Sequence, residues 1–182
     1  MKRVVLSLAA LIAIAGAGSL SAQAGMRFGI GGGLLLPLSD YKTGDKTGFL
    51  VGADGTYWLT GSPIGIRVDA SYSQTSEASG ITPHKTKMIG GMAELVYAMG
   101  KSADPARPYV FGGLGLFNVK LSAGGTDTSE TKVGFGGGAG VAFKLGSSST
   151  RVFVEGRYAT VKAFSTTLPA IGIKAGLRFG GK

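Results

Sequence analysis

The sequence contains no cysteine and only one histidine, His84. Without cysteine, a structural disulfide and a thiolate metal site are both excluded. Beyond residue 24 no apolar run reaches the roughly 20 residues that a membrane-spanning helix needs. Neither a helical period nor an interdomain linker is visible there. These absences predict one domain, residues 25–182, that is built without disulfides or helices, and we expect no metal and no cofactor.

The N-terminal segment has the features of a cleavable secretory signal peptide. Lys2 and Arg3 form a positive region, residues 4–17 form an apolar core, and an Ala-Gln-Ala site occupies 22–24. A small-x-small site after such a core is where a signal peptidase cuts. The apolar core is too short to cross a bilayer as a helix. We therefore expect a signal peptide over 1–24 and export of the rest.

Glycine is abundant, with 33 residues, and the chain alternates apolar with small or polar residues. Ile66 and Val68, for example, alternate with Arg67 and Asp69. A period of two predicts a β-strand with one apolar and one polar face. Eight segments show this period at about the 9 to 11 residues of a tilted membrane strand. They cover 26–36, 48–59, 64–75, 86–98, 108–119, 132–145, 151–160 and 169–179. The segment 108–119 is apolar on both faces, so its inward face is not assigned.

The formal net charge is +9, but the basic residues are scattered, without runs or interleaved aromatics. This distribution argues against nucleic acid as a partner. Attraction to an anionic membrane surface and ordinary solvated charge both remain open.

The connections between the predicted strands differ in length. Those at 60–63 and 146–150 are short and turn-like, as expected for the periplasmic side of an outer-membrane barrel. The connection at 98–107 falls on the same side but is long. The longer polar loops of the opposite side are predicted at 37–47, 76–85 and 120–131.

Alternation alone does not say which face meets lipid, because a soluble barrel would alternate as well. Aromatic residues at two levels, glycine crowded on the polar face and an even number of strands favour the membrane. Closure also removes the exposed sheet edges. We therefore predict an all-β fold, an eight-stranded antiparallel up-and-down transmembrane β-barrel. The predicted aromatic belts comprise Phe28, Phe49, Tyr57, Tyr72, Tyr97, Tyr109, Phe117, Phe143, Tyr158 and Phe179.

This orientation turns a set of ionised side chains into the lumen. An isolated charge removed from water costs several kcal/mol, so these groups should pair with one another. The interior of an eight-stranded barrel is just wide enough for side chains to fill. We expect a plugged, charge-paired lumen, with a narrow ion path as the alternative. The predicted network comprises Asp54, Arg67, Asp69, Glu94, Lys144, Glu155, Arg157, Lys174 and Arg178.

Three stretches resemble a known family. They are Pro-Tyr-Val-Phe-Gly-Gly-Leu-Gly at 108–115, Val-Glu-Gly-Arg-Tyr at 154–158 and Gly-Leu-Arg-Phe at 176–179. The chain resembles the small eight-stranded outer-membrane β-barrel proteins of Gram-negative-type bacteria, which include the OmpA transmembrane domain, OmpX and opacity-type proteins. The resemblance implies an outer-membrane location and insertion by the barrel-assembly machinery, which reads a final aromatic such as Phe179. Here Gly180, Gly181 and Lys182 follow that aromatic.

Some barrels of similar appearance modify lipid A, which requires a nucleophile beside a base. His84 is flanked by lysine and lacks a His-x-Ser pairing, so we expect an exposed loop histidine. The loop acids, Asp45 among them, lack calcium-loop spacing and are expected to be solvated. The sequence thus predicts a non-enzymatic protein with a structural or adhesion-like role carried by its loops. Outer-membrane lipid, lipopolysaccharide and an unknown surface ligand are the expected partners. A narrow pore and a lipid A-modifying enzyme remain the alternatives.

Overall fold

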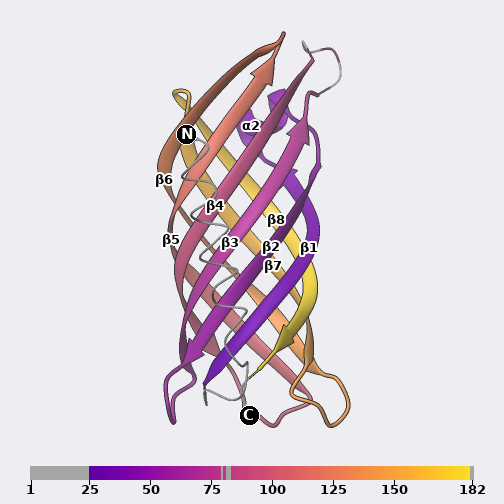
Figure 1. Cartoon of the computed structure of the whole chain (residues 1–182), viewed down its shortest axis with the longest axis vertical. Helices are drawn as coiled ribbons and strands as arrows, with labels where there is room; N and C mark the ends of the chain where they lie inside the picture. Colours follow the sequence, from indigo (N-terminus) through magenta and orange to yellow (C-terminus); the bar gives the residue numbers. More distant parts are fainter. Residues whose placement is uncertain (1–24, 79, 81–82, 181–182) are drawn as a thin grey trace.

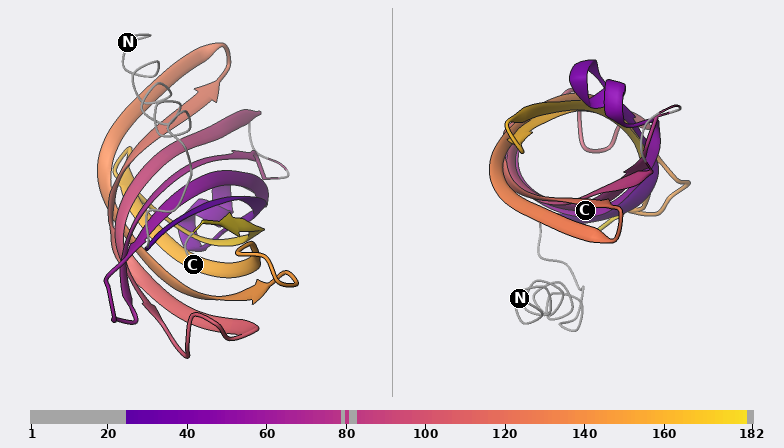
Figure 2. Two further views of the ribbon diagram at one scale, coloured as in Figure 1. Left: turned by 60° about the horizontal axis from the view of Figure 1, so that its bottom comes forward. Right: turned by 90° about the horizontal axis from the view of Figure 1, so that it is seen from above.

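The computed structural model describes residues 25–78, 80 and 83–180; the predicted signal peptide lies outside the described residues. Eight antiparallel strands close into one barrel, each bonded to its neighbours in sequence and β8 bonded back to β1 (Figures 1 and 2). The strands are β1 (Met26–Pro37), β2 (Gly48–Trp58), β3 (Ile64–Ser76), β4 (His84–Ala98), β5 (Ala106–Ala123), β6 (Thr126–Lys144), β7 (Arg151–Ala163) and β8 (Thr166–Phe179). The end at which β1 begins and β8 ends is called the near end, and the opposite one the far end.

All eight predicted strands and their closure are confirmed, but the predicted loop 120–131 is wrong. β5 and β6 continue as a paired ladder and turn through Gly124 and Gly125, which both have positive φ angles. β7 and β8 likewise meet at Phe164 and Ser165, again with positive φ. Such angles suit the tight turns of β-hairpins. Beyond the membrane both faces of a strand meet water, so apolar alternation ends although the ladder continues.

The expectation that no helix follows residue 24 is also wrong. A short helix, α2 (Ser39–Gly44), connects β1 to β2 at the far end and lies against the outside of the ring (Figure 2). The Leu38 amide before it donates to the Pro169 carbonyl of β8, at 2.9 Å. Six residues are fewer than two turns, which is too few to display a helical period. In the described part of the chain, no helix is long and apolar enough to cross a membrane.

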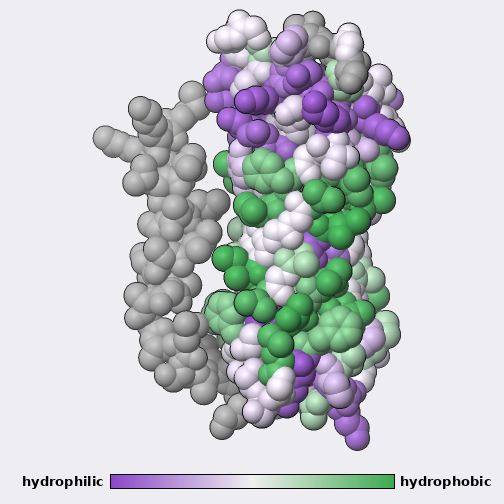
Figure 3. Space-filling view, turned by 90° about the vertical axis from the view of Figure 1, so that its right-hand side faces the viewer, coloured by the Kyte–Doolittle hydropathy of each residue, from purple (hydrophilic) through white to green (hydrophobic). Residues whose placement is uncertain are grey.

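The apolar faces of the strands point outward. Val68, Leu95, Leu114 and Val133 are each more than 60 % exposed. Figure 3 shows hydrophobic side chains grouped around the middle and lower part of the barrel, below a hydrophilic far end. Large apolar side chains at this exposure, in one continuous band, suit contact with lipid.

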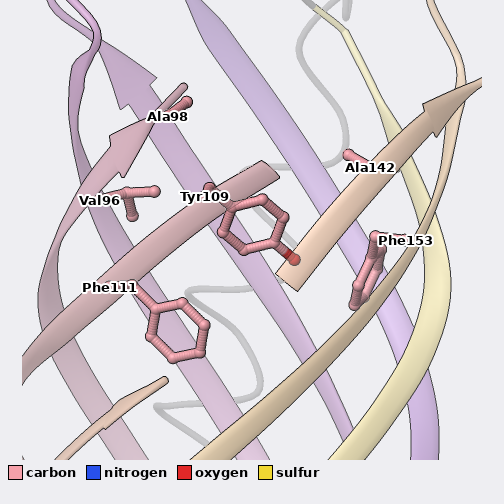
Figure 4. Packing of buried hydrophobic residues seen from close by; sticks show 6 residues of the cluster. All are labelled: Val96, Ala98, Tyr109, Phe111, Ala142 and Phe153. Carbon is pink, nitrogen blue, oxygen red and sulfur yellow. The ribbon is translucent and has the colours of Figure 1, made fainter. Parts of the chain in front are cut away.

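The inward face of β5 carries its aromatics. Tyr109, Phe111 and Phe117 are buried inside the barrel, whereas Val110 and Leu114 point outward. Tyr109 and Phe111 belong to an interior cluster with Val96, Ala98, Ala142 and Phe153 (Figure 4). Tyr109 and Phe117 are therefore not part of an outer aromatic belt, and that prediction is wrong for these two residues.

The other eight predicted belt residues lie on the outer surface, in two levels. Phe28 and Phe179 stack near one end, with ring centroids 6.5 Å apart, and Phe49 and Tyr72 near the other, at 5.9 Å. Phe28 and Tyr72 are half-buried, and the remaining members are exposed. Those exposed members are Phe49, Tyr57, Tyr97, Phe143, Tyr158 and Phe179.

Inward glycines make room for the inward aromatics. A Cβ atom at Gly140 would lie 2.5 Å from the Tyr109 hydroxyl oxygen, and one at Gly90 would lie 2.6 Å from the Phe117 ring. Neither position accepts a larger residue without moving a buried ring. The glycines of the polar face thus leave the space that the β5 aromatic rings fill.

Candidate functional site

Eight of the nine predicted lumenal charges gather midway along the barrel, and we call them the central cluster. Seven of them are buried, and the Arg157 side chain is 14 % exposed. The ninth, Lys144, is exposed at the near end of β6 and lies outside the cluster. The members are Asp54, Arg67, Asp69, Glu94, Glu155, Arg157, Lys174 and Arg178.

Glu155 of β7 is the hub of the central cluster. Its Oε2 lies 3.1 Å from Arg67 Nη1 and 3.0 Å from Arg178 Nη2, and its Oε1 lies 3.3 Å from Lys174 Nζ. The Tyr109 hydroxyl donates to the same Oε2 at 2.9 Å. One carboxylate therefore ties together side chains from β3, β5 and β8.

The other three acids complete the network around this hub. Asp69 accepts from Arg157 at 2.8 Å and from Lys174 at 2.9 Å. Glu94 pairs with Arg67 at 2.5 Å and with Arg157 at 3.1 Å. Asp54 pairs with Arg178 at 3.3 Å. Four carboxylates thus face four cationic side chains, and the centre of the lumen is neutral.

Aromatic rings enclose the cations of the central cluster. The Arg67 guanidinium lies 4.0 Å from the Phe111 ring centroid, and that of Arg178 lies 4.2 Å from Phe153. These ring faces stabilise positive charge where water is scarce. Sequence reasoning missed both aromatics. The signal available for Phe111 was a fifth strand that is apolar on both faces, and for Phe153 it was a position on the same face of the seventh strand as Glu155.

Small cavities flank the central cluster. Toward the far end lies one of about 70 Å³, lined by Met88, Met92 and Phe117 above Asp69 and Glu155. Toward the near end lies one of about 20 Å³. Spaces of this size hold a few water molecules at most.

A second charged group, which we call the mouth cluster, lies at the near end. It comprises Arg27, Lys101, Arg107 and Arg151, with Asp104 as the nearby acid. The two-residue period places Arg27 and Arg151 on the inward faces of β1 and β7, so the sequence could have identified both as lumenal charges. Arg107 lies just before the predicted fifth strand and carried no such signal.

At the far end His84 does not behave as an exposed loop histidine. It is the first residue of β4, its side chain is 12 % exposed, and its Nε2 lies 3.2 Å from Asp45 Oδ2. Asp45 is itself buried and accepts from the Thr75 hydroxyl at 2.5 Å, so it is not a solvated loop acid. Tyr41 of α2 bonds Thr75 at 3.0 Å.

Burial is the main cause that raises the pKa of Tyr41 to about 12, so this phenol stays neutral. The contacts among Tyr41, Thr75, Asp45 and His84 fasten α2 to β3 and β4. They also place the His84 imidazole against the Asp45 carboxylate. Among the described residues, no group of three or more His, Cys, Asp or Glu side chains could hold a metal ion.

Comparisons with known proteins agree with this geometry. Curated proteins include none that matches the sequence. Among solved structures, Neisserial surface protein A is similar at a TM-score of 0.66 and 20 % identity, over 86 % of this chain and 97 % of that one. Ail, the attachment invasion locus protein of Yersinia pestis, is similar at a TM-score of 0.52 and 22 % identity, over 86 % of this chain and 100 % of that one. At such identities these likenesses show the fold.

The family profile described as "Outer membrane protein beta-barrel domain" matches residues 7–179. This match covers all eight strands and both charge clusters. The chain belongs to the outer membrane protein β-barrel domain family, which indicates an outer-membrane location.

Proposed function

We propose that the protein is a closed outer-membrane barrel that acts through the surface it displays at the far end. Outer-membrane barrels have short turns in the periplasm and longer extensions outside the cell. The near end carries the turns between β2 and β3 and between β6 and β7, and the far end carries α2 and the extended β5–β6 hairpin. We therefore assign the near end to the periplasm.

The observation that carries the closed lumen is the central cluster. Its side chains reach across the barrel from β2, β3, β4, β7 and β8 and bond one another at its centre. Opening an ion path would require these pairs to separate, at several kcal/mol for each charge left unpaired. A structural and surface-interaction role fits such a filled scaffold better than conduction does.

The far end offers an anionic partner a place to bind. Lys87 of β4 lies directly opposite Lys120 of β5 in the ladder. Like charges in this position repel, and a bound anion relieves that repulsion. Lys120 also contacts Asp127 at 2.6 Å, which neutralises it only in part. Lipopolysaccharide phosphate is the partner we propose for this surface. Surface display and attachment, named for the two similar structures, are compatible with it.

Conductance in planar bilayers tests the closed lumen. The purified wild-type protein should give no stable current steps. The double variant Arg67→Ser/Glu94→Ser removes one acid and one base, keeps the remaining charges balanced and empties part of the cross-section, so it should conduct. Stable wild-type steps of uniform size would contradict the proposal.

Lipopolysaccharide binding tests the surface role. Replacing Lys87 and Lys120 together by Gln should weaken binding in a titration of the purified protein, because two cations are lost from one spot. The matched control is Lys144→Gln at the opposite end, which should bind as the wild type does. Equal affinity of all three proteins would remove this surface from the proposal.

A further inference from the structure

A pocket opens at the near end of the barrel, apart from the central cluster and the far-end surface. Its volume is about 520 Å³, and it lies between the turn 59–63 and the connection 99–105. Arg27, Trp58, Lys101 and Arg107 line it. Pockets of 300 to roughly 1,000 Å³ are typical of small-molecule sites.

The charges around this pocket are unbalanced, unlike those of the central cluster. Arg27 and Arg107 are 9 % and 8 % exposed. Neither makes an ion pair in the described residues, and Arg27 lies within electrostatic range of Arg107, Arg151 and Arg178. The nearby carboxylate is Asp104, whose Oδ2 accepts the Lys101 amide at 2.7 Å. Positive charge this deeply buried calls for an anion.

Two buried hydrogen-bond donors of the pocket lining also lack acceptors in the described part of the chain: Arg107 Nε and Trp58 Nε1. The Arg107 guanidinium is stacked on the Trp58 ring, 4.6 Å from its centroid, which fixes both groups in place. Leaving such donors unpaired costs free energy. A ligand that supplies several acceptor oxygens would satisfy them.

The wall of the pocket is itself held by arginine. Arg151 donates to the carbonyl oxygens of Ala142, Ser102 and Asp104, at 3.1, 2.7 and 3.0 Å. Arg27 donates to the Ser102 hydroxyl at 3.3 Å. These bonds hold the unusually long connection 99–105 against the barrel mouth, where its residues form one wall of the pocket.

We propose that this pocket binds a phosphoryl group, either of a phospholipid headgroup at the membrane boundary or of a soluble periplasmic phosphate. Guanidinium groups bind phosphate oxygens in paired hydrogen bonds, and Lys101 adds a mobile cation at the rim. A phosphoryl group brings up to two negative charges and several acceptors, which matches the excess charge and the unpaired donors. The volume exceeds that of a bare phosphate ion and leaves room for the group attached to it.

The protein carries its own probe, because Trp58 is the single tryptophan of the chain. Processed wild-type protein in maltoside micelles, titrated with inorganic phosphate, should show a saturable change in Trp58 emission. Chloride at the same ionic strength should leave the emission unchanged. If chloride reproduces the change, the effect is screening and the proposal fails.

Variants then locate the site. Arg107→Gln should weaken phosphate binding about tenfold, as expected for one charge-assisted hydrogen bond. Lys101→Gln, on an exposed turn, should weaken it by a smaller factor and keeps the test valid if Arg107→Gln does not fold. Lys132→Gln, at the far end, is the matched control and should bind as the wild type does. Equal affinities in Lys101→Gln, Arg107→Gln and wild type would overturn the assignment.

A lipid arm separates the two sources of phosphate. Phosphatidylglycerol added to the micelles is compared with the same amount of neutral diacylglycerol. A response to phosphatidylglycerol alone supports a headgroup site, and a response to inorganic phosphate as well shows that the phosphoryl group suffices. If neither phosphate source gives a saturable change beyond the neutral lipid, the pocket is no phosphate site. None of these outcomes depends on conductance or on lipopolysaccharide binding.

Discussion

The central cluster and the mouth cluster use the same side chain for different purposes. Arg67 and Arg178 are each tied to carboxylates and enclosed by aromatic rings. Arg151 is instead satisfied by backbone carbonyls, and Arg107 keeps an unpaired donor beside a pocket. The paired charges of the central cluster fill the lumen, whereas the unpaired positive charges of the mouth cluster suit the binding of an anion. The contrast teaches that the partner of an arginine, more than its burial, shows what it is for.

The largest expected effect is at the hub. Glu155→Gln keeps the size of the side chain but leaves Arg67, Lys174 and Arg178 short of one carboxylate. Breaking a buried pair from one side costs about 3 to 5 kcal/mol of folding free energy. Urea unfolding in detergent micelles measures this loss of stability. The folded fraction at each urea concentration is read from the difference in gel mobility between the folded and the heat-denatured protein. Lys144→Gln is the matched control, and a loss no larger than in that variant would show that the central pairs contribute little.

A smaller effect is expected for Arg151→Gln at the mouth. This change removes three hydrogen bonds to backbone carbonyls without stranding a carboxylate, so we expect a loss of about 1 to 3 kcal/mol. The connection 99–105 should exchange its amide hydrogens faster, while the turn at 145–150 serves as the internal reference. Unchanged exchange at 99–105 would mean that Arg151 does not hold this wall.

The smallest effect should have the opposite sign. Lys101→Gln removes one of several like charges at the mouth and should stabilise the protein by about 0.3 kcal/mol at low salt. Screening should abolish the gain in 1 M salt, where the Debye length falls to about 3 Å. Destabilisation at low salt would mean that the mouth cluster is not self-repelling, which would erase its difference from the centre.

Strand positions were predictable because lipid and lumen alternate along each strand, and this imposes a period of two on residues such as Ile66 and Arg67. The rule stops where lipid stops. Beyond the membrane the consecutive residues Asp127, Thr128, Ser129 and Glu130 make both faces polar, yet they continue the β6 ladder. Backbone pairing leaves no hydropathy signal there, so the sequence predicts a loop where the structure has a hairpin.

The lumenal charges were predictable for the same reason, but their aromatic enclosure was not. Tyr109 and Phe117 have the chemistry of interfacial belt residues, and only the register of β5 against β4 and β6 turns them inward. Lys144 is the opposite case, a residue predicted to face the lumen that lies in water instead. Its parity is that of an inward residue, but it stands at the strand end, where the lumen opens to water.

The chain order of the central cluster has a consequence for assembly. Strands β2, β3, β4 and β7 bring Asp54, Asp69, Glu94 and Glu155 but only two of the cations; β8 brings the other two, Lys174 and Arg178. A polypeptide cut off before its last strand could not close on β1, and its inward faces would carry two surplus negative charges. Electroneutrality of the interior thus arrives with β8, the same strand that closes the sheet into a barrel.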